Sequence, residues 1–187
     1  MKKSILLCCI AFLTACQPAE PVTDEPYEIS DGLFVELQKI GGWDGKTIPG
    51  SQICQRDGGL GESPPLVIYE VPKGTNAIIV EYNDLDDLKL ARDGGMGTVG
   101  YPYFETGDQT AVLRPVPMGE LLPPYAFKER NHRFDGGRRG AYMAPCSRGA
   151  GHRYQATVKA VKREVSEETG QLTTRVLGMG QINLGTY

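Results

Sequence analysis

The sequence is poor in the residues that build the commonest catalytic centres. Its 187 residues include two histidines and one tryptophan, so a catalytic zinc site has few ligands to draw on. It contains no Gly-x-Ser-x-Gly turn, the motif that carries the serine nucleophile of α/β-hydrolases. Runs with helical periodicity are also scarce, whereas 24 glycines, 13 prolines and 9 tyrosines favour a loop-rich β protein. We therefore expect a mainly β, non-enzymatic domain that needs neither a cofactor nor a metal.

A strong excess of charge of one sign is lacking as well. The chain has 20 basic and 23 acidic residues, and its formal net charge is −3. Binding to a nucleic-acid backbone requires a basic face, for which this balance offers no support. Hydrophobic residues make up 40% and charged residues 23% of the chain, as in globular proteins. The composition therefore predicts a globular domain with no nucleic-acid partner.

No apolar run is long enough to cross a membrane, but the N-terminus carries a short one. The segment Ile5–Leu13 is apolar throughout and follows Lys2 and Lys3. A helix that spans the bilayer needs about 20 apolar residues. A shorter run after a basic head is instead typical of the hydrophobic region of a secretory signal peptide.

The residues after this run suggest a lipid anchor. In Leu13–Cys16, a branched aliphatic residue and two small residues precede a cysteine, which resembles the bacterial lipobox. The resemblance implies that residues 1–15 are removed and that Cys16 carries acyl chains such as palmitate, which hold the protein in a membrane. Because Gln17 follows the cysteine, it implies the outer membrane, with the protein facing the periplasm. An ordinary signal peptide that ends near a cysteine is the alternative.

The remaining chain divides into a tether and one domain. Residues 16–27 contain the cysteine and a stretch rich in proline and acid, which is unable to bury a core and predicts an extended tether. Residues 28–187 suit a single domain. We assign Leu172–Gly178 to a short helix and Gln181–Thr186 to a terminal strand. Further β-branched and aromatic runs between turn residues predict strands; they are Leu33–Leu37, Leu66–Tyr69, Ala77–Tyr82, Thr110–Leu113 and Arg153–Val161.

Only two cysteines, Cys54 and Cys146, follow the predicted lipidation site. In an oxidising compartment they have one intramolecular pairing available, but their spacing does not decide between a disulfide and two free thiols. A free Cys146 would be the right residue type for a nucleophile, with His152 as base and Asp84 as orienting group. A disulfide would remove this thiol-hydrolase alternative.

Two short motifs are similar to ligand-binding patterns but lack essential parts. The acidic cluster Asn83–Asp87 fails the EF-hand pattern, because the required glycine and glutamate are missing. Gly95–Gly100 matches Gly-x-Gly-x-x-Gly, but the sequence Tyr-Pro-Tyr that follows it opposes the helix of a dinucleotide site. We expect a flexible loop at Gly95–Gly100.

A series of other short motifs extends to the C-terminus. They are Ile48–Pro49 with Cys54, Gly61–Leu66, Val71–Thr75, Asp84–Asp86, Tyr142–Cys146, Gly151–Tyr154 and Leu184–Tyr187. In this order and spacing they resemble the phosphatidylethanolamine-binding protein family, in its bacterial Raf-kinase-inhibitor-like branch. The resemblance implies a compact domain of two packed antiparallel sheets with short peripheral helices.

The resemblance also implies a pocket for a small phosphate-bearing or other anionic ligand, such as a phospholipid head group. It places Asp84, Asp86, Pro145, His152 and Tyr154 at this pocket. A histidine and a tyrosine hydroxyl donate hydrogen bonds to an anion, and a carboxylate orients the imidazole or meets an ammonium group of the ligand. The alternatives are a structural role for the histidine in the sheet and, for the two aspartates, hydrogen bonds to their own backbone turn.

The chain departs from the family pattern at this pocket. The family's first pocket histidine belongs to a His-Trp pair, and the corresponding segment Gly95–Phe104 contains neither residue. Leu85 and Ala144 replace a proline and a glycine of the family motifs. Arg148 and His132 are candidates to replace the lost donor, although the polar neighbours of His132 predict a solvated side chain. The alternative function is therefore a protein-interaction or inhibitor module of the envelope, with a degenerate pocket and another envelope protein as its partner.

Overall fold

The computed structural model describes residues 30–105, 107–119, 121–134 and 139–187. The predicted signal peptide, Cys16 and the tether lie outside the described residues, as do the lipid anchor and the domain boundaries that depend on them. These assignments stay predictions.

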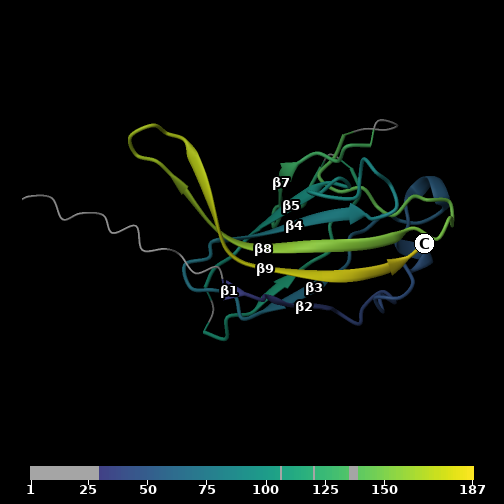
Figure 1. Cartoon of the computed structure of the whole chain (residues 1–187), viewed down its shortest axis with the longest axis horizontal. Helices are drawn as coiled ribbons and strands as arrows, with labels where there is room; N and C mark the ends of the chain where they lie inside the picture. Colours follow the sequence, from purple (N-terminus) through teal and green to yellow (C-terminus); the bar gives the residue numbers. More distant parts are fainter. Residues whose placement is uncertain (1–29, 106, 120, 135–138) are drawn as a thin grey trace, which may run out of the picture.

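In the described part of the chain, strands form one sheet of six and one of three (Figure 1). The order across the larger sheet is β1 (Ser30–Asp31), β9 (Leu172–Thr186), β8 (Arg153–Val165), β4 (Ala77–Asp84), β5 (Thr98–Pro102) and β7 (Phe127–Arg130). The smaller sheet contains β2 (Phe34–Leu37), β3 (Leu66–Tyr69) and β6 (Ala111–Leu113). All neighbouring strands are antiparallel except β1 and β9. The predicted mainly β fold with two sheets is confirmed, and each segment predicted to be a strand lies in one, apart from the first residues Leu33 and Thr110.

Helical structure is limited to two 3₁₀ turns in the described residues, η1 (Gly50–Gln52) and η2 (Gln55–Asp57). Among these residues, no helix is long and apolar enough to cross a membrane. The helix predicted at Leu172–Gly178 is wrong, because this segment is the first half of β9 and pairs with β8. Its local sequence leaves the choice open, and the hydrogen bonds of the neighbouring strand decide it.

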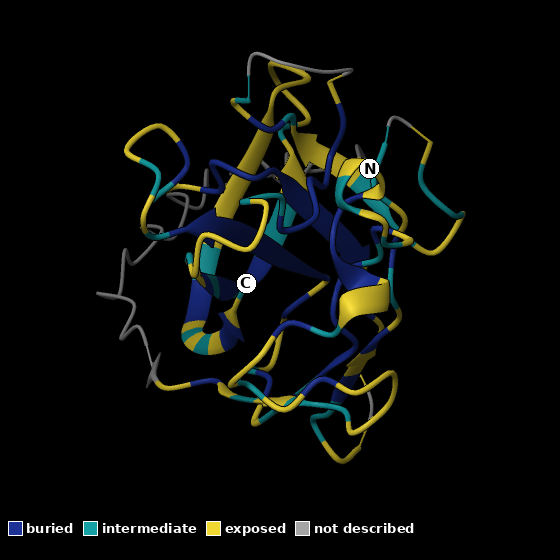
Figure 2. Ribbon diagram, turned by 90° about the vertical axis from the view of Figure 1, so that its right-hand side faces the viewer, coloured by how far each residue is buried: buried dark blue, intermediate teal, exposed yellow. Residues whose placement is uncertain are grey.

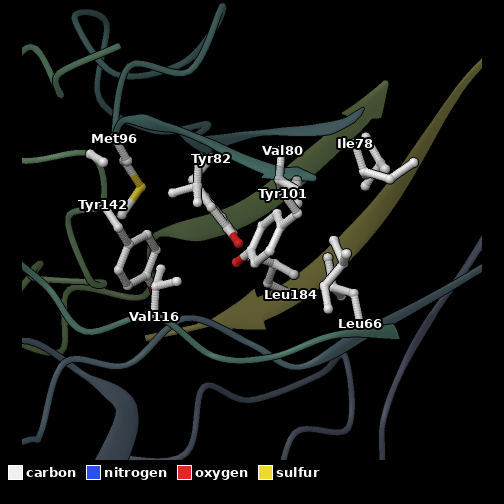
Figure 3. Packing of buried hydrophobic residues seen from close by; sticks show 14 of the residues in the cluster. Leu66, Ile78, Val80, Tyr82, Met96, Tyr101, Val116, Tyr142 and Leu184 are labelled. Atoms are coloured by element: carbon white, nitrogen blue, oxygen red, sulfur yellow. The ribbon is translucent and has the colours of Figure 1, made fainter. Parts of the chain in front are cut away.

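The core lies between the two sheets and takes side chains from both. Alternation along a strand sends every second side chain to one face. Burial of the predicted inward face of β8 is confirmed, since no member of this face is more than 1% exposed; the members are Tyr154, Ala156, Val158 and Ala160. Figure 2 shows the buried residues on the central strands and the exposed residues mainly on the surrounding loops. In Figure 3 the aromatic rings of Tyr82, Tyr101 and Tyr142 fill the middle of this core.

Strand β4 runs through the centre of the larger sheet, between β5 and β8. All eight of its residues are buried. Its first half is apolar, as burial on both faces requires, and its second half is polar. The carboxylate of Glu81 is compensated by Lys159, whose Nζ lies 2.8 Å from Glu81 Oε1. The strand ends at Asp84 and so brings a buried carboxylate to the end of the sheet.

The segment predicted as a flexible loop, Gly95–Gly100, is buried, and from Thr98 onward it belongs to β5. The loop prediction is therefore wrong for this part. Gly97 has a φ of 108°, and a Cβ at this position would lie 2.1 Å from the carbonyl oxygen of Ala141. Only glycine allows the two backbones to pack this closely.

Strands β8 and β9 continue beyond the rest of the sheet as a two-stranded arm (Figure 1). Pairing of β8 with β4 ends at Val161, whereas its pairing with β9 continues to Val165 and Leu172. At the start of the arm, the Asn76 side chain takes the place of a neighbouring strand. Its Nδ2 donates to the carbonyl of Arg163 and its Oδ1 accepts from the Arg163 N–H, both at 2.8 Å.

Candidate functional site

The candidate site lies where the end of β4 meets the start of β8. The antiparallel register makes Asp84 the direct partner of Tyr154. His152 lies just before β8, and its backbone exchanges two hydrogen bonds with that of the C-terminal Tyr187. The fold thus brings three of the five predicted pocket residues together, although they come from segments about 70 positions apart in the chain.

Asp84 orients the imidazole of His152. The carboxylate is 5% exposed, and its Oδ2 lies 2.8 Å from His152 Nδ1. Asp84 Oδ1 also accepts a hydrogen bond from the backbone N–H of Asp86, at 3.1 Å. No hydrogen bond between described residues involves Nε2 of His152, and the side chain is 29% exposed. The ring is therefore held through one nitrogen while the other is left for a ligand.

Tyr154 adds a buried hydroxyl next to this pair. The hydroxyl makes no hydrogen bond to any described residue, although Ser147 and Asp84 lie close enough to influence its ionisation. Burial, reinforced by the negative charge of Asp84, raises the pKa of Tyr154 to about 12. At neutral pH the hydroxyl therefore keeps its proton, and it is available as a donor.

Asp86, the second predicted carboxylate, is bound to its neighbour Arg153. Its Oδ2 accepts from the Arg153 backbone N–H at 2.8 Å and from Nε at 3.0 Å, and its Oδ1 accepts from Nη2 at 2.7 Å. These hydrogen bonds lower the pKa of Asp86 to about 2. The carboxylate is thus committed to an arginine and is less available to a ligand than Asp84.

The loop that carries Pro145 is attached to the site by a disulfide. Cys54 and Cys146 are joined although 92 positions separate them, and the buried Pro145 accepts a hydrogen bond from the Cys54 N–H at 2.9 Å. Ser147, which follows Cys146, donates from its hydroxyl to the carbonyl of Tyr187. Because both sulfurs are bonded, the thiol-hydrolase alternative lacks its nucleophile in the oxidised protein.

The same disulfide decides one candidate metal site. Among the described residues, one group of three potential metal ligands lies close together, namely Cys54, Asp57 and Cys146. Cysteine binds a metal ion as its thiolate. Here the two sulfurs are bonded to each other, so neither is a metal ligand in the oxidised protein. Asp57 in turn accepts hydrogen bonds from Arg56 Nε and from the backbone N–H of Arg148, both at 2.9 Å.

Arg56 borders the site and was missed by the sequence analysis. Its Nη2 donates to the carbonyl of Cys146, which precedes Ser147 in the loop beside Tyr154. Its charge also interacts with Tyr154 and Tyr187. Arg56 lies two positions after Cys54, so a known Cys54–Cys146 disulfide would have placed it near the loop of Cys146. The sequence alone left this disulfide undecided.

The two predicted substitutes for the lost histidine differ in their placement. Arg148 is exposed and lies in the same loop system, where its backbone binds Asp57. His132 is buried, with 9% exposure, so the prediction of a solvated side chain is wrong. The chain on both sides of it is held, because His132 N–H binds the carbonyl of Gly140 and Arg133 N–H binds that of Gly95. The polar neighbours of His132 in the sequence do not indicate that these backbone hydrogen bonds bury its side chain.

A cavity of about 260 Å³ opens next to Tyr154. It is lined by Gly45, Lys46, Leu85, Arg153, Tyr154, Asn183, Gly185 and Thr186. Lys46 and Arg153 are its basic residues, so it favours a negatively charged occupant. His152 does not belong to its lining.

Comparisons with known proteins give few matches. No protein-family model matches the chain, and no curated protein does. Among solved structures, the chain is similar to a crystal structure described as a phosphatidylethanolamine-binding protein homologue from Chlamydia trachomatis. The two chains are 21% identical, the match covers 82% of this chain and 96% of the other, and the TM-score is 0.46.

Proposed function

We propose that the protein is a lipid-anchored envelope protein that binds a small phosphate-bearing or other anionic ligand beside His152 and Tyr154. The observation that carries the proposal is the pairing of a fixed, half-buried imidazole with a buried tyrosine hydroxyl for which the described residues offer no hydrogen bond of good geometry. A buried donor without an acceptor is costly, and a ligand oxygen would satisfy it.

The chemistry of the cluster suits a phosphate oxygen. Tyr154 donates from its hydroxyl, and His152 donates from Nε2 when its ring is protonated. The guanidinium of Arg56, held on the adjoining loop by Asp57 and the Cys146 carbonyl, supplies positive charge from the side of the disulfide. Arginine binds phosphate through parallel N–H groups, so it offsets the missing histidine.

The binding proposal is tested by titrating the full chain, in detergent micelles, with inorganic phosphate and with phosphoethanolamine. Histidine ring resonances report the binding, and His132→Gln assigns them, because the chain has two histidines. We expect saturable shifts at His152 that are lost in Tyr154→Phe. Absence of any shift up to about 10 mM ligand, about tenfold above the dissociation constant of a weak millimolar complex, would contradict the proposal.

The anchoring part of the proposal rests on the sequence of residues 1–16. A Cys16→Ser chain expressed in a bacterium is expected to leave the membrane fraction, because the acyl chains that hold the protein there are lost. Full retention in the membrane fraction would contradict lipidation at Cys16. This experiment is independent of ligand binding.

One observation favours the second function, an envelope interaction or inhibitor module. The backbone of Ala141 fills the space next to Gly97, in the segment where the family's first pocket histidine is missing, and Asp86 is engaged by Arg153. Neither a histidine at this segment nor a free Asp86 carboxylate is thus on offer to a ligand. A chain that binds neither phosphate nor phosphoethanolamine, but whose purification from crosslinked cells yields a defined envelope protein, would support this function.

A further inference from the structure

A second cavity, of about 320 Å³, opens at the seam between the two sheets. It is lined by Ile78, Tyr101, Pro102, Tyr103, Phe104, Thr110, Ala111, Val112, Leu113, Arg114 and Tyr125. We call it the seam cleft. None of the residues of the candidate site described above takes part in it, so it is a separate feature of the fold.

The seam cleft exists because two strands have an unpaired edge at the same place. Strand β7 pairs with Thr98–Gly100 of β5, and among the described residues no strand pairs with β5 on that side from Tyr101 onward. Strand β6 is the last strand of the smaller sheet. The floor between the two edges is apolar, and the buried side chains of Ile78 and Leu113 belong to it. Figure 3 shows Ile78 and Tyr101 on the two neighbouring strands of the larger sheet.

Four aromatic side chains belong to the walls. Tyr101 and Tyr103 are buried in the fold, Tyr125 is partly exposed, and Phe104 at the rim is 83% exposed. Burying an exposed aromatic ring is favourable, and rings prefer to pack against other planar groups. The walls therefore select a ligand with an aromatic or another flat apolar body. Ligand cavities in proteins begin at about 300 Å³, so the seam cleft is large enough for a small molecule.

Arg114 is the one charged residue in this lining. Its Cζ lies 5.7 Å from the centre of the Tyr125 ring, and no carboxylate among the described residues pairs with it. Its surroundings are braced, because Tyr101 donates from its hydroxyl to the Arg114 carbonyl at 3.2 Å and Tyr125 to the Pro115 carbonyl at 2.6 Å. These bonds hold the backbone around Arg114, and its exposed guanidinium beside apolar walls is suited to bidentate binding of a carboxylate.

We propose that the seam cleft is a second binding site, for a small organic anion with an aromatic or similarly flat body and one carboxylate. The body packs between the tyrosine rings and Phe104. The carboxylate binds the Arg114 guanidinium at the mouth. Such a ligand bridges β5 and β6 and so joins the two sheets at a place where their own hydrogen bonds do not.

The test uses the full chain in detergent micelles and two matched probes, indole-3-acetate and the uncharged indole-3-acetamide. Backbone amide resonances of Tyr101, Tyr103, Phe104 and Ala111–Arg114 report the binding. We expect saturable shifts with the acid and about tenfold weaker binding of the amide, because the amide lacks the charge-assisted hydrogen bonds. Arg114→Met is expected to weaken the acid about tenfold and to leave the amide unchanged. Arg92→Met removes another exposed arginine and should change neither.

Several results would overturn the proposal. Equal affinities for the acid and the amide would reject the anionic ligand class. Shifts confined to His152 and Tyr154, or no shifts up to about 10 mM probe, would reject the site itself. The comparison of acid with amide in the unaltered protein remains decisive if Arg114→Met does not fold.

Discussion

The two ends of the β8–β9 ladder have the same strand pairing but different surroundings. At one end, Tyr154 is 1% exposed, and β4, the disulfide-linked loop and the C-terminal residue surround it. At the other end, in the arm, Val165 and Leu172 pair with each other and are 63% and 52% exposed. Pairing alone therefore does not bury a side chain. A fixed polar cluster needs further layers to exclude water, and only the site end has them.

The largest effect is expected from removing the disulfide at the site end. Cys54→Ser with Cys146→Ser should lower the free energy of unfolding by about 2–4 kcal/mol, because a long loop is no longer closed in the unfolded chain. The measurement is the urea midpoint of the full chain with and without reductant. If the double variant and the reduced wild type keep the midpoint of the oxidised protein, the site end is not braced in this way.

The second-largest effect is expected from replacing a glycine by alanine near the site, compared with the same substitution in the arm. Gly97→Ala places a Cβ 2.1 Å from the Ala141 carbonyl oxygen, so we expect a loss of about 2 kcal/mol or more. Gly170, near the tip of the arm, also has a positive φ but no atom within 4 Å of such a Cβ. Gly170→Ala should cost only about 1 kcal/mol of backbone strain. Equal thermal midpoints for the two variants would contradict the comparison.

Acid should act on the site end through Asp86. Arg153 lowers the pKa of this carboxylate from 3.8 to about 2, so its contribution to stability is complete above the unfolded pKa. The contribution is lost as the pH falls from about 4 to about 2. Urea midpoints of the wild type and Asp86→Asn should therefore differ at pH 7 and converge towards pH 2. A difference that is constant between pH 7 and pH 2 would show that the ion pair does not stabilise the fold.

The smallest effect is expected at the arm. Val165→Thr and Leu172→Thr should each change the free energy of unfolding by less than about 0.5 kcal/mol, since their side chains are exposed in the folded protein. The matched substitution Val158→Thr, in the buried part of the same strand, should cost about 2 kcal/mol because it buries an unpaired hydroxyl. Similar urea midpoints for all three variants would show that the buried part of β8 and the arm contribute equally to the free energy of unfolding.

Local patterns were sufficient to predict β2, β3, β4, β6, β8 and the end of β9, but not β1, β5 or β7. The alternation at Arg153–Val161 gave the correct buried face of β8, because side-chain direction in a strand follows from the backbone alone. The pattern failed at Leu172–Gly178, where the segment is polar and its state depends on the strand beside it. It also failed at Thr98–Gly100, where the glycines of Gly95–Gly100 suggest a loop. Close contacts require two of them, Gly97 against the Ala141 backbone and Gly100 against the Phe127 ring.

For the candidate site, the sequence by itself determined which chemical groups are present and, through the family resemblance, that Asp84, His152 and Tyr154 lie close together. Tertiary structure decided how they are used. Whether a carboxylate faces an imidazole, as Asp84 does, or an arginine next to it, as Asp86 does, depends on strand register and loop placement. Hydrogen bonds and ion pairs act over a few ångströms, and these distances exist only after the chain has folded.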